Sequence, residues 1–193
     1  MFERAQNSVA ALNIKTLLAD PNFGFELSPE YLMKIHGAIF GGVLENAGKL
    51  RRYPLTWDLF AGREEFEGER PEKLAALLAD TMQQERQFFS APPDTPEIIA
   101  HIARLNAFLW GTHYFEGGNT RTTTIFTIKY LRALGYNVEN APFIAVPYLY
   151  KNALARACFA YPEEGEKTDK YVIFFLRNVV LGEHNEIRFK KEL

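Results

Sequence analysis

Apolar residues recur every three or four positions along much of the chain, which is the spacing of one face of an α-helix. Ser28-Pro29-Glu30 is typical of a helix start, because it offers an N-cap, a proline at the first position and an acid in the first turn. The pattern that follows predicts a helix over residues 29–40. Similar patterns predict helices over residues 71–82, 95–111, 121–134, 148–160 and 169–181.

Strand patterns are scarce, and one stretch alternates as a β-hairpin would. Its apolar residues precede two glycines that suit turns, in the order Tyr53, Leu55, Trp57, Leu59, Gly62 and Gly68. The sequence therefore predicts an all-α helical bundle with at most one small β-hairpin, over residues 52–69. No internal repeat, low-complexity tract or linker divides the chain, so we expect a single domain over residues 1–193.

Composition and charge narrow the functional class. Of the 193 residues, 47% are hydrophobic, which supports a sizeable core and excludes wholesale disorder. The 22 basic and 24 acidic residues give a net charge of -2, which disfavours direct nucleic-acid binding. The single cysteine, Cys158, excludes an internal disulfide and fits a reducing compartment. We find neither a signal-like start nor an uncharged run of about 20 residues, and expect a cytoplasmic protein without a membrane segment.

The segment that carries candidate chemistry is His113-Tyr114-Phe115-Glu116-Gly117-Gly118-Asn119-Thr120-Arg121, between two predicted helices. Gly117 and Gly118 permit backbone conformations and close approaches that other residues do not. The free amides and the positive end of the following helix dipole would face this loop, which makes it a candidate phosphate site. Arg121 adds a planar cation suited to phosphate oxygens. His113 titrates near neutrality and suits a general base.

Plainer interpretations stand beside this one. A Gly-Gly turn between two helices can be a simple connection, and a Gly-rich motif alone is weak evidence. His113 and Glu116 lie three residues apart, but the histidines form no HExxH or Cys/His cluster, so zinc is disfavoured. We interpret His36 as a core histidine and Cys158 as a small buried hydrophobe. Tyr148, Tyr150 and Asn152 could either pack in the core or line the base end of a nucleotide pocket.

The candidate loop resembles the signature of the Fic (Fic/Doc) family, H-x-F-x-(D/E)-G-N-x-R. It matches at His113, Phe115, Gly118, Asn119 and Arg121. Similarity extends to the helix over residues 31–40, to an AGxxR turn over residues 47–51 and to the C-terminal helices, and covers roughly residues 16–186. The resemblance implies the Fic fold, with residues 52–69 in the position of the family's flap.

The resemblance also implies an activity, the transfer of AMP from ATP to a Ser, Thr or Tyr hydroxyl of a target protein. His113 would then take the proton of the hydroxyl, and Phe115 would be buried and hold the loop. Gly117, Gly118, Asn119, Thr120 and Arg121 would cradle the phosphates, with Arg121 at the leaving diphosphate. The flap would clamp an extended segment of the target by strand-like pairing.

The chain departs from the family pattern at several positions. Gly117 stands where the family has an acid that binds Mg²⁺, and the neighbouring Glu116 is the remaining candidate ligand. Thr124 stands where many members have a further arginine. The family's inhibitory pattern (S/T)-x-x-x-E-(G/N) would fall on residues 8–13, where Leu12 replaces the required Glu. The sequence thus contains no convincing inhibitory motif.

These departures leave alternatives to adenylyl transfer with Mg²⁺ and ATP. Gly117 favours a catalytically impaired Fic fold that binds a nucleotide or a protein partner. A Doc-like phosphotransferase, with ATP bound in the opposite direction, is a third hypothesis. The target protein, the preferred nucleobase and the oligomeric state are not encoded in any recognisable pattern.

Overall fold

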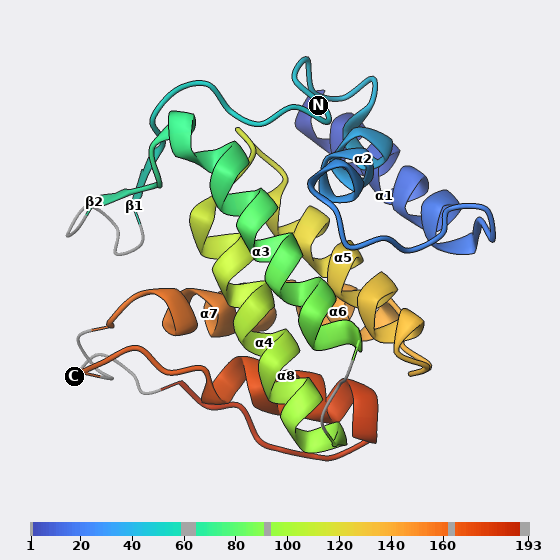
Figure 1. Ribbon diagram of the computed structural model, residues 1–193, viewed down its shortest axis with the longest axis vertical. Coiled ribbons are helices and arrows are strands. Elements are labelled where there is room, and N and C mark those ends of the chain that lie inside the picture. The colour runs from blue at the N-terminus through green and yellow to red at the C-terminus, as the bar shows by residue number, and fades with distance from the viewer. Residues whose placement is uncertain (1, 59–64, 91–93, 162–164, 190–193) are drawn as a thin grey trace. The chain divides into compact units, whose positions relative to one another are not determined.

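A computed structural model describes residues 2–58, 65–90, 94–161 and 165–189, and Figure 1 shows their helices and strands. The chain divides into two compact units. The first comprises residues 1–91 and 112–129, and the second comprises residues 92–111 and 130–193. Helices are the main secondary structure of each unit.

In the first unit, α1 (Phe2–Ala19) packs against α2 (Pro29–Phe40), and both lie at the blue end of the chain in Figure 1. The Ser28 hydroxyl caps α2 by accepting a hydrogen bond from the Tyr31 amide at 3.1 Å. The buried face of α2 includes Leu32, Ile35 and Ile39, each with 0% exposure. The predicted helix over residues 29–40 is therefore confirmed.

A short antiparallel ladder follows α2. It joins β1 (Thr56–Asp58) to β2 (Glu65–Glu67), with Thr56 opposite Glu67 and Asp58 opposite Glu65. Leu59 and Gly62, which the sequence placed in this hairpin, lie outside the described residues. A 3₁₀ turn (Pro71–Lys73) then leads into α3 (Leu74–Ser90), which is longer than the predicted helix over residues 71–82.

Aromatic side chains fill the centre of the first unit. Phe25 contacts the rings of Tyr31 and Phe126, with centroid distances of 5.5 and 5.9 Å. Phe126 belongs to α5 (Asn119–Ala133), which begins in this unit and whose last residues belong to the second. These contacts fix the first turns of α5 against α2 and its preceding loop, and thereby position the candidate site.

The second unit contains most of α4 (Thr95–Thr112), together with α6 (Ala141–Ala145), α7 (Pro147–Cys158) and α8 (Lys170–Leu181). Helices α7 and α8 pack against each other. Tyr150 contacts the rings of Phe143 and Phe175, at centroid distances of 5.0 and 4.5 Å. Its hydroxyl also meets the side-chain amide of Asn106.

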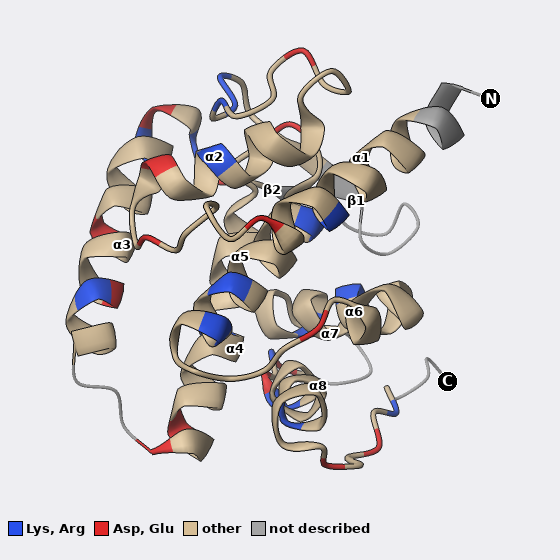
Figure 2. Ribbon diagram, turned by 90° about the vertical axis from the view of Figure 1, so that its right-hand side faces the viewer, with Lys and Arg blue, Asp and Glu red and all other residues tan. Residues whose placement is uncertain are grey.

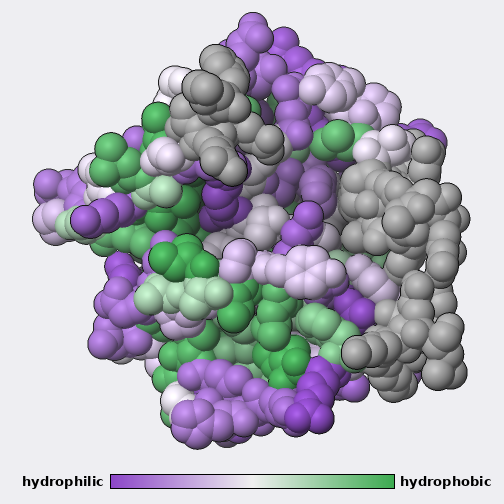
Figure 3. All heavy atoms as spheres, turned by 180° about the vertical axis from the view of Figure 1, so that it is seen from behind, coloured by the Kyte–Doolittle hydropathy of each residue, from purple (hydrophilic) through white to green (hydrophobic). Residues whose placement is uncertain are grey.

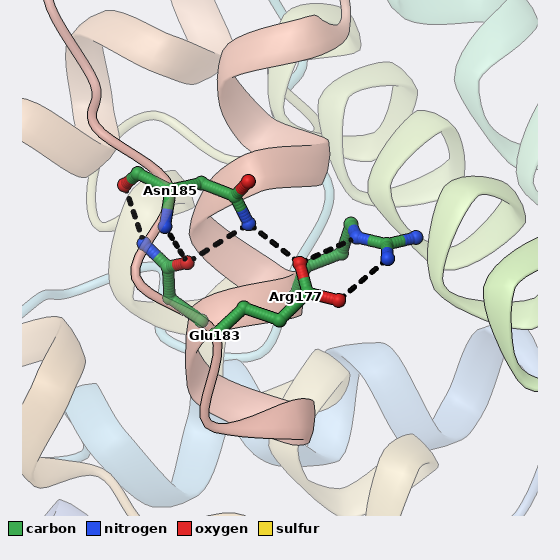
Figure 4. A network of polar contacts seen from close by, with 4 residues as sticks. Arg177, Glu183 and Asn185 are labelled. Atoms are coloured by element: carbon green, nitrogen blue, oxygen red, sulfur yellow. Dashed lines mark hydrogen bonds and ion pairs between the residues drawn. The ribbon is translucent and has the colours of Figure 1, made fainter.

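Polar contacts hold the C-terminal segment onto the second unit. The Arg156 guanidinium lies over the Tyr161 ring at 4.1 Å and over the Phe189 ring at 4.2 Å. Figure 4 shows a second clamp, in which Arg177 contacts both carboxylate oxygens of Glu183 at 2.8 and 2.5 Å. Asn185 extends this network to Asn178 on α8.

The predicted helices are all present, and the all-α fold class is confirmed. Helices α1 and α6 were not predicted. Gly111 was expected to end the third predicted helix, but α4 continues to Thr112. Gly111 is instead a close-packing position, because a Cβ there would lie 2.8 Å from the Cys158 sulfur. Cys158 donates a hydrogen bond to the Ala107 carbonyl, and burial raises its pKa to about 12.

The surface is mixed in charge and hydropathy. In Figure 2, basic and acidic residues are interspersed along the helices, in keeping with the near-neutral net charge. Figure 3 shows hydrophobic and hydrophilic side chains reaching the surface on the same face. Among the described residues, no helix is both long and apolar enough to span a membrane.

Candidate functional site

The candidate loop begins and ends at residues with left-handed backbone. His113 directly follows α4 and has φ of 51°, the only positive φ of a non-glycine among the described residues. Gly118 has φ of 75° and immediately precedes Asn119, the first residue of α5. Helix α5 therefore begins two residues earlier than predicted, which places Asn119 and Thr120 in its first turn. The amides of that turn face the loop.

The two glycines of the loop have different constraints. A Cβ on Gly118 would lie 2.2 Å from Cε2 and 2.3 Å from Cζ of Phe40, so the α2 ring occupies that space. Gly118 is thus required by conformation and by packing. A Cβ on Gly117 would meet only the Leu44 Cδ1 atom, at 3.8 Å, and its φ is not positive. The backbone at position 117 can therefore accommodate a side chain.

Asn119 holds the loop closed on itself. Its side-chain oxygen accepts a hydrogen bond from the Phe115 amide at 3.0 Å, and its Nδ2 donates to the Phe115 carbonyl at 2.8 Å. The Phe115 ring is 1% exposed and stacks on His36, with a centroid distance of 3.9 Å and an interplanar angle of 6°. Phe115 is therefore buried, as the resemblance implies, and the loop is anchored to α2.

His36 on α2 connects the turn at Gly48 to the loop. Its Nδ1 accepts a hydrogen bond from the Gly48 amide at 2.8 Å, so the ring proton lies on Nε2. Nε2 in turn donates to the Gly117 carbonyl at 3.0 Å. Burial is the main cause that lowers the pKa of His36, and nearby Arg121 lowers it further. The core-histidine interpretation is correct, since His36 is 1% exposed, but no sequence pattern predicts its contact with Gly117.

Arg121 projects from the first turn of α5. Its guanidinium lies 4.7 Å from the centroid of the Phe40 ring and donates a hydrogen bond to the Asn7 side chain at 3.2 Å. Desolvation lowers the pKa of Arg121, but the group stays fully charged at neutral pH. Asn7 on α1 thus joins the site, and no sequence motif marks it.

Glu116 faces neutral hydrogen-bond donors. The Asn46 Nδ2 atom lies 3.2 Å from both carboxylate oxygens of Glu116. The Tyr53 hydroxyl also donates to this carboxylate, and this hydrogen bond is the main cause that raises the pKa of Tyr53. Donors of this kind orient a carboxylate without neutralising its charge.

The three threonines after Arg121 use their hydroxyls for hydrogen bonds at the start of α5. The hydroxyls of Thr122, Thr123 and Thr124 donate to backbone carbonyls three or four residues earlier, at Gly118, Asn119 and Thr120. Thr124, at the position where the resemblance implies an arginine in many family members, is 7% exposed. These hydroxyls therefore have their hydrogen-bond acceptors within α5 and at Gly118, the residue directly before it.

The remaining candidate residues belong to the second unit. Tyr150 is 1% exposed and packs in the core, whereas Tyr148 is 78% exposed. The Asn152 side chain donates to the Tyr148 carbonyl at 2.9 Å and accepts from Arg156 at 3.3 Å.

The first unit contains the other candidate residues, His113, Glu116, Asn119 and Arg121, in one loop and the helix turn that follows it.

Two chemical capacities follow from this arrangement. The N-terminus of α5, the left-handed Gly118 and the nearby Arg121 are groups of the kind that phosphate sites use. His113, at the other end of the loop, carries an imidazole, the side chain that most often serves as a general base. No group of three or more His, Cys, Asp or Glu side chains within the described part of the chain could hold a metal ion. Glu116 is the one acid of the loop, and Mg²⁺ commonly uses one or two carboxylates with substrate phosphates.

Comparisons with solved structures support this fold. The chain is similar to the N-terminal Fic domain of the effector Bep8 from Bartonella sp. 1-1C, with a TM-score of 0.75 and 17% identity over 93% of this chain and 84% of that one. The N-terminal Fic domain of a Bep effector from Bartonella sp. AR 15-3 is similar with a TM-score of 0.76 and 18% identity, over 93% of this chain and 81% of that one. BepC from Bartonella tribocorum, solved with bound AMPPNP, is similar with a TM-score of 0.70 and 17% identity, over 92% of this chain and 85% of that one.

No curated protein sequence matches the chain. The Fic/DOC family model matches residues 26–131, which include α2, the hairpin region, the candidate loop and most of α5. The match extends over more than half of the chain, so this protein belongs to the Fic/DOC family.

Proposed function

We propose that this protein transfers AMP from ATP to a hydroxyl group of a target protein. One observation carries the proposal: a single anchored loop joins His113 to the N-terminus of α5, with the left-handed Gly118 at the junction. A proton acceptor and an anion site thus lie at the two ends of one short segment. The bound AMPPNP in the similar BepC structure adds support, because AMPPNP has the triphosphate outline of ATP.

The phosphates would bind at the start of α5. The backbone amides of residues 118–121 would stabilise the negative charge that develops on the α-phosphate during transfer. Asn119 contributes by fixing the loop through Phe115. Arg121 would contact the leaving diphosphate, and its contacts with Phe40 and Asn7 hold the guanidinium in place beforehand. Such preorganisation reduces the entropy that the Arg121 side chain loses when the nucleotide binds.

His113 would act as the general base. A ring nitrogen would accept the proton of the target hydroxyl as its oxygen attacks the α-phosphorus. The new oxygen–phosphorus bond forms while the bond to the β-phosphate oxygen breaks, and pyrophosphate leaves. A general base of this kind contributes about 10²–10⁴-fold to the rate.

A metal ion would accompany the nucleotide. We propose that Glu116 contributes a carboxylate ligand to Mg²⁺ that is bound mainly by the phosphates of ATP, since Gly117 offers no side chain. Mg²⁺ would supply neutralisation of charge on the leaving diphosphate. Asn46 and Tyr53 would orient the Glu116 carboxylate for this role.

The hairpin would bind the target. Its ladder between β1 and β2 offers backbone groups to an extended segment, which is the mode of β-strand addition. A protein partner with a hydroxyl side chain in that segment is therefore the proposed second substrate. We also propose a cytoplasmic site of action, as the single cysteine suggests.

Gly117 favours a second candidate function, in which the chain binds nucleotide without efficient transfer. A missing metal ligand would slow transfer heavily while leaving the α5 anion site intact. Incubation of the protein with α-³²P-ATP and Mg²⁺ in a bacterial lysate separates the two. Transfer predicts labelled protein that disappears with His113→Ala. Nucleotide binding by calorimetry without any label supports the binding function and overturns the transferase.

A further inference from the structure

Arg51, between α2 and the hairpin, is a buried cation of the first unit that makes several hydrogen bonds. Arg51 is buried, with 2% exposure, and its guanidinium donates hydrogen bonds to backbone carbonyls. Nε donates to the His113 carbonyl at 2.6 Å, and one terminal nitrogen donates to the Tyr53 carbonyl at 2.9 Å. The other terminal nitrogen donates to the Glu69 carbonyl and, at 3.5 Å, to that of Thr112. The Arg51 amide also donates to the Tyr114 carbonyl at 3.0 Å.

These contacts bracket the strained residue of the candidate site. Arg51 binds the carbonyls of Thr112, His113 and Tyr114, so it contacts the residue with positive φ and both of its neighbours. A non-glycine residue in the left-handed region persists where its surroundings over-determine the backbone. Arg51 supplies that constraint at His113.

The same guanidinium reaches both ends of the hairpin. Tyr53 lies three residues before β1, and Glu69 lies two residues after β2. Their carbonyls accept from different nitrogens of Arg51. Only a planar fork with several fixed donors can serve these separate acceptors together, because a lysine offers a single point charge. One buried side chain thus joins the hairpin to the backbone of His113.

We propose that Arg51 is a positioning residue for the transfer reaction, which sets the His113 ring and the hairpin in a fixed relation. This inference rests on the proposed function, in which His113 is the base and the hairpin holds the target. Arg51 touches the backbone of His113 and not its reacting ring, so it acts on the rate through geometry. Burial lowers the pKa of Arg51, and the charge of the nearby Glu69 carboxylate partly opposes this shift.

The test compares Arg51→Lys and Arg51→Met with the matched control Arg86→Lys. Arg86 lies in the same unit and also donates to a backbone carbonyl, that of Leu27, away from the loop. With α-³²P-ATP, we expect Arg51→Lys to lower kcat for label transfer by about 10²-fold, the cost of a misplacement of about 1 Å. The KM for ATP should change by less than about threefold, since the anion site is untouched. Arg86→Lys should leave both constants near the wild-type values. A wild-type kcat in folded Arg51→Lys overturns the inference and leaves the proposed function standing.

A second readout does not depend on turnover. The imidazole signals of His113, assigned with His113→Gln, should shift in Arg51→Lys, while those of His101 and His184 stay in place. If wild-type protein transfers no label, the proposed function fails, and this spectrum still decides whether Arg51 positions His113. Unchanged His113 signals overturn the inference.

A third readout covers variants that fail to fold. In wild-type protein, the Arg51 Nε–H should exchange with solvent far more slowly than that of the exposed Arg52. Equal exchange rates overturn the inference, because the bond to His113 would then be absent.

Discussion

The sharpest structural prediction concerns the adjacent glycines of the loop. In Gly118→Ala, the new Cβ must enter a left-handed backbone and a space filled by the Phe40 ring, 2.2 Å away. The left-handed conformation costs about 1–2 kcal/mol for an L-residue with a side chain. Overpacking of a filled site adds about 1–3 kcal/mol. We therefore expect the free energy of unfolding to fall by about 2–5 kcal/mol.

The same substitution should weaken nucleotide binding. Phe40 carries the Arg121 guanidinium on its face and contacts His36 at a centroid distance of 4.8 Å. A displaced Phe40 ring would move Arg121 away from the start of α5. Urea denaturation measures the stability, and calorimetry with ATP below the unfolding range measures the affinity, which should drop at least about tenfold if one charge-assisted contact is lost.

Gly117→Ala is the matched control one residue earlier. Its Cβ would make an ordinary contact of 3.8 Å with Leu44, and its backbone is not left-handed. Loss of a glycine from the unfolded chain should then stabilise the protein by about 0.4–1 kcal/mol. Equal changes in the urea midpoint for Gly117→Ala and Gly118→Ala would refute the packing of Gly118 against Phe40.

Further predictions follow from the same loop. Arg121→Ala should weaken ATP binding more than AMP binding, because the guanidinium is assigned to the leaving diphosphate; equal losses by calorimetry would contradict that assignment. Gly117→Glu fits the available space and should raise Mg²⁺-dependent labelling from ATP about tenfold or more by supplying a metal ligand. Glu116→Ala should abolish labelling if Glu116 already serves as that ligand, and unchanged labelling in both variants would reject the metal assignment. Burial lowers the pKa of His36 in the folded protein, where its Nδ1 accepts a hydrogen bond from Gly48. The unfolded chain therefore binds a proton at His36 more readily, and the free energy of unfolding should fall as the pH drops below about 6.5. Urea midpoints between pH 7.5 and 5 should show this slope reduced in His36→Asn, and an identical slope would remove His36 as its source.

The helices that the sequence predicts well are those with clear capping residues and prolines at their ends. Ser28 and Pro29 mark the start of α2 because capping and a fixed φ act within one turn. Helix α1 has a weaker signal, since the first buried residue within its described part, residues 6–19, is the small Ala10, and α6 is only five residues long. Gly111 was misread because a glycine required by a distant side chain looks the same in sequence as one that ends a helix.

The site follows the same division between local and distant effects. Residues 113–121 are contiguous, so their motif and glycines are visible in sequence. The contacts of Arg51, Asn46 and His36 with the loop connect residues more than sixty positions apart, and they depend on how α2 and the following turns pack. No periodicity or spacing predicts such contacts. Arg51 ends an AGxxR pattern that the sequence shows, but its role requires knowing which carbonyls it reaches.

The most direct test of the proposed transfer compares the two ends of the triphosphate. Purified protein is incubated with Mg²⁺ and a bacterial lysate, in parallel with α-³²P-ATP and with γ-³²P-ATP. Lysate without the protein gives the background label, including γ-label from its own kinases, which is subtracted, and His113→Ala serves as the control. Adenylyl transfer predicts protein label from the α-position alone, and its loss in His113→Ala. Label from the γ-position alone would indicate phosphotransfer, and α-label that persists in His113→Ala would remove His113 from the mechanism; either result contradicts the proposed function.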